Sequence, residues 1–232
     1  KYSLKILSLG LIKLLYRNSH FFALSSPGLT LPSALRALGT SDLQDPCEFA
    51  PGLTRTELGL DPKHDQANIY LVAGELSARK YVPEILSAWT SGISEQNVLV
   101  LAGTLSQNLD QDLLASARNT SNIHFVEGYI SNTEFDSWID QADFVFVLHK
   151  NAGSSGVAIK AAFGGTTIIV GGDRSIKSIV AQMTNNYAIC EPVSSQAIKS
   201  ITESIELQKL ESKVSQSSLI SPNEWSETLV NS

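Results

Sequence analysis

The feature that most constrains this chain is the regular alternation, after residue 67, of short apolar runs with segments of helical spacing. Six runs of strand length are apolar throughout: 68–74, 97–103, 123–128, 143–149, 166–172 and 187–190. The segments between and after them have a helical pattern, near 79–91, 109–118, 132–141, 156–163, 175–183 and 195–215. Strands that are apolar on both faces and separated by helices predict right-handed crossovers and a parallel sheet. We therefore expect an α/β, Rossmann-like domain with helices on both faces of the sheet.

The sequence before residue 67 is less regular. Residues 20–25 predict a short buried strand, and proline and glycine interrupt the stretch from 40 to 66 without sustained periodicity. This pattern predicts a linker or an irregular connection and a domain boundary, followed by the sheet domain over 67–216. The chain begins at Lys1 with an apolar helical segment and no initiator Met, so we expect it to be part of a longer protein.

Charge and cysteine content exclude several classes of function. The net charge is −6, which disfavours binding to nucleic acid, where phosphates demand clustered Lys and Arg. Cys47 and Cys190 lie far apart, with no CxxC and no His at ligand spacing, so neither a zinc site nor a disulfide framework is indicated. A reducing cytoplasm is the expected location.

The apolar segment near the N-terminus, residues 4–16, is too short and too charged to span a bilayer. Its basic residues leave open a peripheral contact with an anionic membrane surface. A helix docked on a core is the interpretation that we favour, because amphipathic helices mostly cover cores. The basic residues are Lys1, Lys5, Lys13 and Arg17.

Ligands of an open parallel sheet bind beyond the carboxyl ends of its strands, which directs attention to the loops there. The loop 73–80 follows the first strand and matches neither the dinucleotide fingerprint nor the P-loop. Gly74 nevertheless lets a ligand approach the backbone, and Lys80 supplies a positive charge for phosphate. A tight turn with a surface lysine is the structural alternative.

The loop 150–157 follows the fourth strand and opens a helix of small residues. Its small residues at a helix N-terminus predict an anion site made of backbone N–H groups, and a close-packed turn is the alternative. His149 ends the strand and lies within reach of the same crevice. No carboxylate cluster suited to a metal is present, so we expect none. The candidate anion-binding residues are Gly153, Ser154, Ser155, Gly156 and Val157.

Several motifs occur in the order found in one family. Gly74, Leu76 and Lys80 match the pattern Gly-Arg-Leu-x-x-x-Lys-Gly, with Glu75 and Tyr81 in place of the Arg and the second Gly. The segments 125–130, 135–147 and 223–227 fit the same order. Residues 68–230 therefore resemble the C-terminal, nucleotide-sugar-binding domain of GT-B glycosyltransferases, in particular the family 4-like group. The resemblance implies that residues 217–232 form a helix that crosses back to the N-terminal domain.

The resemblance also implies a function. It is the transfer of a sugar, without a cofactor, from a nucleotide diphosphate-sugar to a glycan or lipid-linked acceptor, in polysaccharide or glycoconjugate biosynthesis. The diphosphate would lie on the 153–157 turn beside Lys80, with the base against Tyr129 and Ile130. Two family glutamates fall on Ala152 and Lys160, so both acids are absent and Lys160 would meet phosphate or ribose oxygens instead.

Two other functions stay open. The departures at Glu75, Ala152 and Lys160 suit a degenerate module that binds or regulates a partner transferase. A nucleotide-sugar epimerase is a weaker alternative on the same fold. In the family, an N-terminal domain holds the acceptor site. The resemblance implies that residues 1–66 are the tail of that domain and the interdomain linker and that most of the domain is absent, so we do not expect the chain alone to complete a catalytic cycle.

Overall fold

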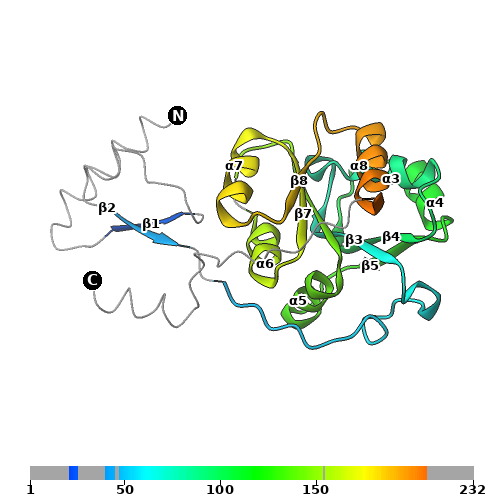
Figure 1. Cartoon of the computed structure of the whole chain (residues 1–232), viewed down its shortest axis with the longest axis horizontal. Coiled ribbons are helices and arrows are strands. Elements are labelled where there is room, and N and C mark those ends of the chain that lie inside the picture. The colour runs from blue at the N-terminus through cyan, green and yellow to red at the C-terminus, as the bar shows by residue number, and fades with distance from the viewer. Residues whose placement is uncertain (1–20, 26–39, 45–46, 154, 208–232) are drawn as a thin grey trace. The chain divides into compact units, whose positions relative to one another are not determined.

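The structure is a computed structural model that describes residues 21–25, 40–44, 47–153 and 155–207 (Figure 1). The chain divides into two compact units, and the second spans Phe49–Ser217. In the first unit, β1 (Phe21–Ser25) and β2 (Thr40–Gln44) form a parallel pair. β1 lies where a strand was predicted, and β2 was not foreseen. The segments predicted as helices at 4–16 and 217–232 lie outside the described residues.

The second unit is built on a six-stranded sheet in the order β5-β4-β3-β6-β7-β8, with every neighbouring pair parallel. This confirms the predicted Rossmann-like sheet. The runs predicted as strands all form strands, within a residue or two at most ends. The strands are β3 (Asn68–Leu76), β4 (Asn97–Leu105), β5 (Ile123–Glu127), β6 (Phe144–His149), β7 (Thr167–Gly172) and β8 (Tyr187–Ile189).

The helices connect successive strands and cover both faces of the sheet. α3 packs against α4 and α8, whereas α6 packs against α5 and α7, so the helices form two groups. Two short 3₁₀ helices, η1 (Pro62–His64) and η2 (Ala78–Lys80), precede and follow β3. The helices are α3 (Val82–Thr90), α4 (Gln111–Arg118), α5 (Asn132–Gln141), α6 (Gly156–Gly164), α7 (Arg174–Met183) and α8 (Ser195–Leu207).

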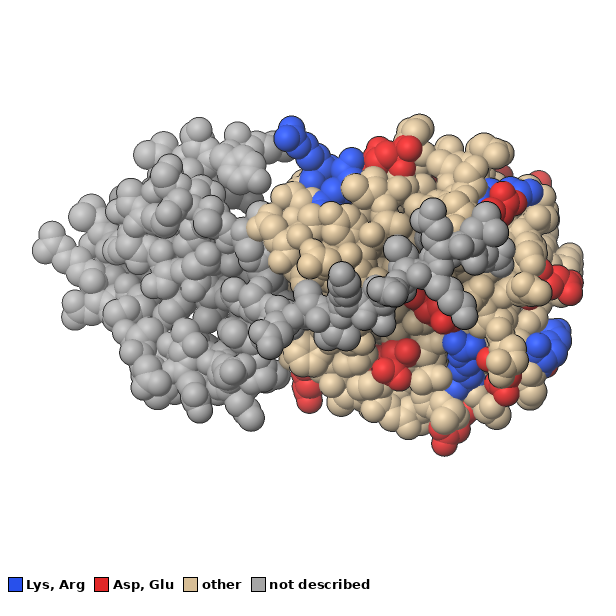
Figure 2. All heavy atoms as spheres, viewed as in Figure 1, with Lys and Arg blue, Asp and Glu red and all other residues tan. Residues whose placement is uncertain are grey.

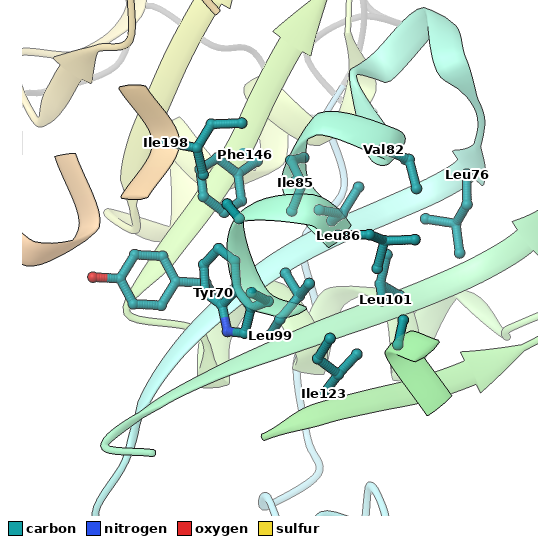
Figure 3. Close-up of a cluster of buried hydrophobic side chains, with 14 of the residues drawn as sticks. Tyr70, Leu76, Val82, Ile85, Leu86, Leu99, Leu101, Ile123, Phe146 and Ile198 are labelled. Carbon is teal, nitrogen blue, oxygen red and sulfur yellow. The ribbon is translucent and has the colours of Figure 1, made fainter. Parts of the chain in front are cut away.

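One buried cluster joins β3, β4 and β6 to α3 and α8 (Figure 3). Tyr70 lies at its centre, fully buried, with ring centroids 5.4 Å from Trp89 and 4.6 Å from Phe144. Figure 3 shows Ile85 and Leu86 of α3 turned toward Leu99 and Leu101 of the sheet. Adjacent residues of a strand point to opposite faces of the sheet. Ile69 and Leu71, which flank Tyr70 in β3 and are fully buried, therefore pack against the helices on the other face.

The segment 49–66, which we call the strap, belongs to the second unit although it was predicted as linker. The backbone N–H of Ala50 donates to Asp136, and those of Gly52 and Leu53 donate to the hydroxyl of Ser137. Both acceptors lie on α5 and are buried. The strap's irregular backbone thus finds hydrogen-bond partners on a helix surface, which places the start of this unit at Phe49.

Candidate functional site

The sheet has a topological switch point between β3 and β6. From β3 the chain proceeds outward through β4 to β5, whereas β6, β7 and β8 continue from the other side of β3. Ligands of open α/β sheets bind at such a point, so the region beyond the carboxyl ends of β3 and β6, which we call the crevice, is where a ligand is expected. The loops that follow these two strands, 77–81 and 150–155, are the two that the sequence singled out.

Lys80 ends η2, just beyond the carboxyl end of β3. Its Nζ donates a hydrogen bond to the backbone oxygen of Ala73, 2.6 Å away, and a Cβ at Gly74 would lie 3.1 Å from the same nitrogen. Burial, and secondarily the nearby Arg79, lower the pKa of Lys80 to about 8. Within the described residues no carboxylate forms an ion pair with Lys80. Its ammonium is thus partly removed from water, and the charge of Glu75 only partly offsets the lowering of its pKa.

His149 ends β6 and is 5% exposed. Burial, followed by the positive charges of Lys80 and Arg79, lowers the pKa of His149 to about 4, although Asp173 acts in the opposite direction. The imidazole is therefore neutral at pH 7 and offers hydrogen bonds rather than charge. The backbone oxygen of His149 accepts the N–H of Asp173 at 2.7 Å, and Gly172 makes this approach sterically feasible.

Two further cations flank the crevice and were not among the predicted site residues. Arg79 lies 3.6 Å from Glu75, and Lys150 lies 3.1 Å from Glu84. The backbone N–H of Lys150 donates to the oxygen of Arg79, so the loops after β3 and β6 are tied together. The sequence offered one signal for both residues: each is basic and lies directly beside a predicted site residue, Lys80 or His149.

The N-terminus of α6 opens at the same edge of the sheet. The hydroxyl of Ser155 caps the helix by accepting the N–H of Ala158, and Val157 is largely buried in the first turn. The first turn has no acidic side chain, and a Cβ at Gly156 would meet nothing within 4 Å. First-turn N–H groups and the helix dipole favour an anion here. Gly153 precedes the cap, and Ser154 lies outside the described residues.

The remaining predicted residues are placed differently. Tyr129 is 93% exposed in the loop after β5, with Ile130 beside it, at the same edge as Lys80 but on the far strand. Lys160 forms a 2.6 Å ion pair with Asp136 on α5, a buried carboxylate that also holds the strap. The structure thus brings together Gly74, Lys80 and His149, and it turns the ammonium of Lys160 toward α5.

The opposite edge of the sheet also has a cavity, of about 630 Å³. It lies below the amino ends of β3, β4 and β5 and is lined by polar side chains such as His64, Gln66 and Gln96. The Nε2 of His64 lies 3.3 Å from the backbone oxygen of Ser121. This cavity is separated by the length of the strands from the crevice that holds Lys80.

Other site types find no support within the described part of the chain. It contains no group of three or more His, Cys, Asp and Glu side chains arranged to hold a metal ion. None of its helices combines the length and apolarity needed to cross a membrane. On the face shown in Figure 2, basic and acidic side chains are interspersed over the described surface.

Fold and site together define a Rossmann-like α/β domain with cationic side chains and glycines at its switch point. Residues 60–218 match the model of the family described as glycosyl transferases group 1. The chain therefore belongs to this family. No curated protein sequence matches the chain.

Solved structures of glycosyltransferases share the fold. HepE of Anabaena, in complex with UDP and glucose, superposes with a TM-score of 0.63 at 11% identity, over 97% of this chain and 66% of that one. The C-terminal domain of LpcC from Francisella tularensis superposes with a TM-score of 0.55 at 20% identity, over 73% of this chain and 91% of that one. Sucrose-phosphate synthase of Thermosynechococcus elongatus superposes with a TM-score of 0.58 at 18% identity, over 86% of this chain and 52% of that one.

These likenesses confirm the predicted resemblance to GT-B glycosyltransferases. The narrower assignment to the family 4-like group stays a prediction. The chain spans about two thirds of the length of HepE and about half that of sucrose-phosphate synthase.

Proposed function

We propose that this chain is the donor-binding half of a glycosyltransferase. The enzyme transfers a hexose from a nucleotide diphosphate-sugar to a glycan or lipid-linked acceptor. The observation that carries the proposal is Lys80, whose half-buried ammonium has no ion-pair partner among the described residues and lies at the switch point of the sheet. The nearby N-terminus of α6 adds backbone donors for a second phosphate. Such an arrangement favours a ligand that brings its own negative charge.

The proposed chemistry is electrostatic. When the bond between the sugar's anomeric carbon and the diphosphate oxygen breaks, negative charge develops on the departing nucleoside diphosphate. Lys80 and the α6 N–H groups meet that charge with donors that are already in place, so little reorganisation is needed as the charge develops. The neutral His149 suits a hydroxyl of the sugar, because an uncharged imidazole both donates and accepts hydrogen bonds. The base is assigned to the segment at Tyr129 and Ile130.

UDP is the first nucleotide to test, because HepE was solved with UDP and with UDP-glucose. The proposal assigns neutralisation of the diphosphate to protein groups and requires no cofactor. It places the reaction in the cytoplasm, in polysaccharide or glycoconjugate biosynthesis, with a membrane surface as the meeting point when the acceptor is lipid-linked. The acceptor contacts belong to a further domain of the whole enzyme.

Thermal unfolding of the 232-residue chain with UDP, GDP, ADP, CDP and dTDP tests the proposal. One nucleotide, at about 100 times its Kd, should stabilise the chain by roughly 2.7 kcal/mol and raise Tm by several degrees. Lys80→Ala should abolish the shift. Lys63→Ala removes a lysine at the opposite edge and is the matched control, for which the shift should persist.

Gly156→Asp is a second probe of the site. Its side chain enters open space and places a negative charge in the first turn of α6, which favours the helix but repels a diphosphate. The variant should be at least as stable as the unaltered chain, and the nucleotide should no longer shift its Tm. If no nucleotide stabilises the unaltered chain, the donor-binding proposal fails and the degenerate, partner-binding module takes its place.

A further inference from the structure

Tyr81 adopts a backbone conformation that its residue type disfavours. Its φ is 56°, in the left-handed region, and among the described residues it is the only one other than glycine with a positive φ. A Cβ makes this region costly, most of all for bulky side chains. Tyr81 immediately follows Lys80 and joins η2 to α3. Strain of this kind at the edge of a ligand crevice calls for a compensating role of the side chain.

The ring of Tyr81 contacts the other loop of the crevice. The Nζ of Lys150 lies 4.6 Å from the centroid of the ring, and the same nitrogen lies 3.1 Å from Oε1 of Glu84. The ring also packs over Gly172, where a Cβ would lie 3.0 Å from Tyr81 Cε2. The ammonium of Lys150 is thus held between an aromatic face and a carboxylate at the carboxyl edge of the sheet. Its side chain is still 40% exposed.

A nucleoside diphosphate carries more negative charge than Lys80 alone can balance. An ammonium has three N–H donors, and the contact with Glu84 leaves donors of Lys150 for phosphate oxygens. A freely rotating lysine would lose side-chain entropy on binding, whereas one restrained against a ring has already lost part of it. The contribution of the Tyr81 ring is therefore to restrain the position of the Lys150 ammonium.

We propose that Tyr81 is a positioning residue that holds the Lys150 ammonium as a second cation for the donor diphosphate. This inference rests on the proposed function, because it adds a further cation to the same site. The aromatic face, not the phenolic hydroxyl, is the part that acts. The strained backbone at position 81 is then retained because the side chain that it carries aims a binding group.

Calorimetric titration of the full chain with UDP provides the test. Tyr81→Leu keeps much of the apolar bulk but loses the π face, and the UDP affinity should fall roughly two- to fivefold, the size of an exposed cation–π contact. Tyr81→Phe keeps the ring and should retain the affinity. In a Lys150→Met background, which itself weakens binding, Tyr81→Leu should cause no further loss, because the two side chains act as one unit.

A second measurement isolates the backbone. Tyr81→Gly and Tyr81→Ala remove the same ring, but only glycine relieves the left-handed strain, so the glycine variant should unfold roughly 2–4 °C above the alanine variant. Both should bind UDP as weakly as Tyr81→Leu. A purely structural role predicts the opposite pattern, with UDP affinity following thermal stability across the series.

The outcomes separate this inference from the proposed function. If UDP binds, Lys80→Ala abolishes binding and Tyr81→Leu changes nothing, the role of Tyr81 is refuted while the donor site stands. Equal losses from Tyr81→Leu in the presence and absence of Lys150 refute it as well. If Lys80→Ala has no effect on UDP binding, the donor site itself is wrong, and the role of Tyr81 falls with it.

Discussion

The two edges of the sheet are built on opposite plans. At the carboxyl edge, glycines end the strands: Gly74 ends the apolar run of β3, Gly103 that of β4, and Gly172 ends β7. A Cβ at Gly103 would overlap the backbone of Gly74, so these positions are small by necessity. At the amino edge, asparagines occupy the corresponding places: Asn68 begins β3, Asn97 begins β4, and Asn122 precedes β5.

The asparagines at the amino edge cross-link the loops. Nδ2 of Asn68 donates to Asn97, and Nδ2 of Asn122 donates to the backbone oxygens of Ile93, Ser94 and Asn97. At the carboxyl edge, by contrast, Lys80 is half-buried and forms no ion pair with a described residue, and Tyr81 is strained. One edge pairs its asparagines internally, and the other leaves positive charge for a ligand. Changes at the amino edge should therefore reduce stability, and changes at the carboxyl edge should reduce binding.

The largest effect is expected for Asn122→Ala. The side chain is 3% exposed, and its removal leaves three backbone oxygens with one donor fewer at a buried site. The free energy of unfolding, measured with urea, should fall by about 3 kcal/mol. Asn119→Ala, which changes an exposed asparagine of the same loop, should change it by less than about 0.5 kcal/mol. A fall in UDP affinity at temperatures where the variant is folded would contradict the division between the edges.

Lys80→Met should have the reverse effect. It removes a desolvated charge, so the free energy of unfolding at pH 7 should rise by about 1 kcal/mol even though the hydrogen bond to Ala73 is lost. The same change should weaken UDP binding by at least about 2 kcal/mol, since a charge-assisted contact with phosphate disappears. Urea unfolding and calorimetry on one preparation measure both. A variant that loses stability and affinity together would show that Lys80 is a structural residue.

Arg55→Lys tests the amino edge with a smaller change. The guanidinium of Arg55 donates to the backbone oxygens of Asp65, Ala67 and Gln141, and it pairs with Asp143 at 3.1 Å. A lysine cannot reproduce this fork, so we expect the free energy of unfolding to fall by about 1–2 kcal/mol. UDP affinity should stay within twofold. A neutral effect on stability would mean that the strap adds little to the fold.

The smallest effect is a pH dependence at the carboxyl edge. Because the pKa of Lys80 is lowered to about 8, its ammonium loses its proton as the pH rises through that value. A bound diphosphate favours the protonated form, so UDP affinity should fall about five- to tenfold between pH 7.5 and 9. The sign for folding is opposite, since the neutral amine is favoured in the folded chain: the free energy of unfolding should rise as the pH increases from about 8 toward the ordinary lysine value. The Lys80→Met variant should lack the Lys80 contribution to both pH dependences. Any change of UDP affinity with pH that remains in this variant measures the titration of the nucleotide itself.

Much of this contrast could be predicted from the sequence. The strands are continuous apolar runs bounded by Asn or Asp and Gly, so their existence, direction and carboxyl-end loops followed from local patterns. Lys80 and the 153–157 turn were identified because their chemistry is carried by single loops. The family resemblance placed a glycine at position 81, which is the only hint of the left-handed backbone that the structure shows for Tyr81.

What the sequence did not reveal depends on partners far apart along the chain. The ion pair of Lys160 with Asp136 joins two helices, and the contact of Lys150 with Tyr81 joins two loops. The strap was predicted as linker because proline and glycine indicate an irregular backbone. Irregularity does not determine whether that backbone packs, and here α5 supplies the hydrogen-bond acceptors.

The strap also sets the unit that can be exchanged between related enzymes. Asp136 accepts hydrogen bonds from Ala50 and from Lys160, so one buried carboxylate joins the strap to the helix whose first turn opens at the crevice. A recombination event at residue 67, where the regular pattern begins, would combine a foreign strap with this carboxylate. An event at residue 49 would carry the strap with its own anchor. The segment that can be exchanged as a unit therefore begins at residue 49, earlier than the Rossmann-like sequence pattern, which begins at residue 67.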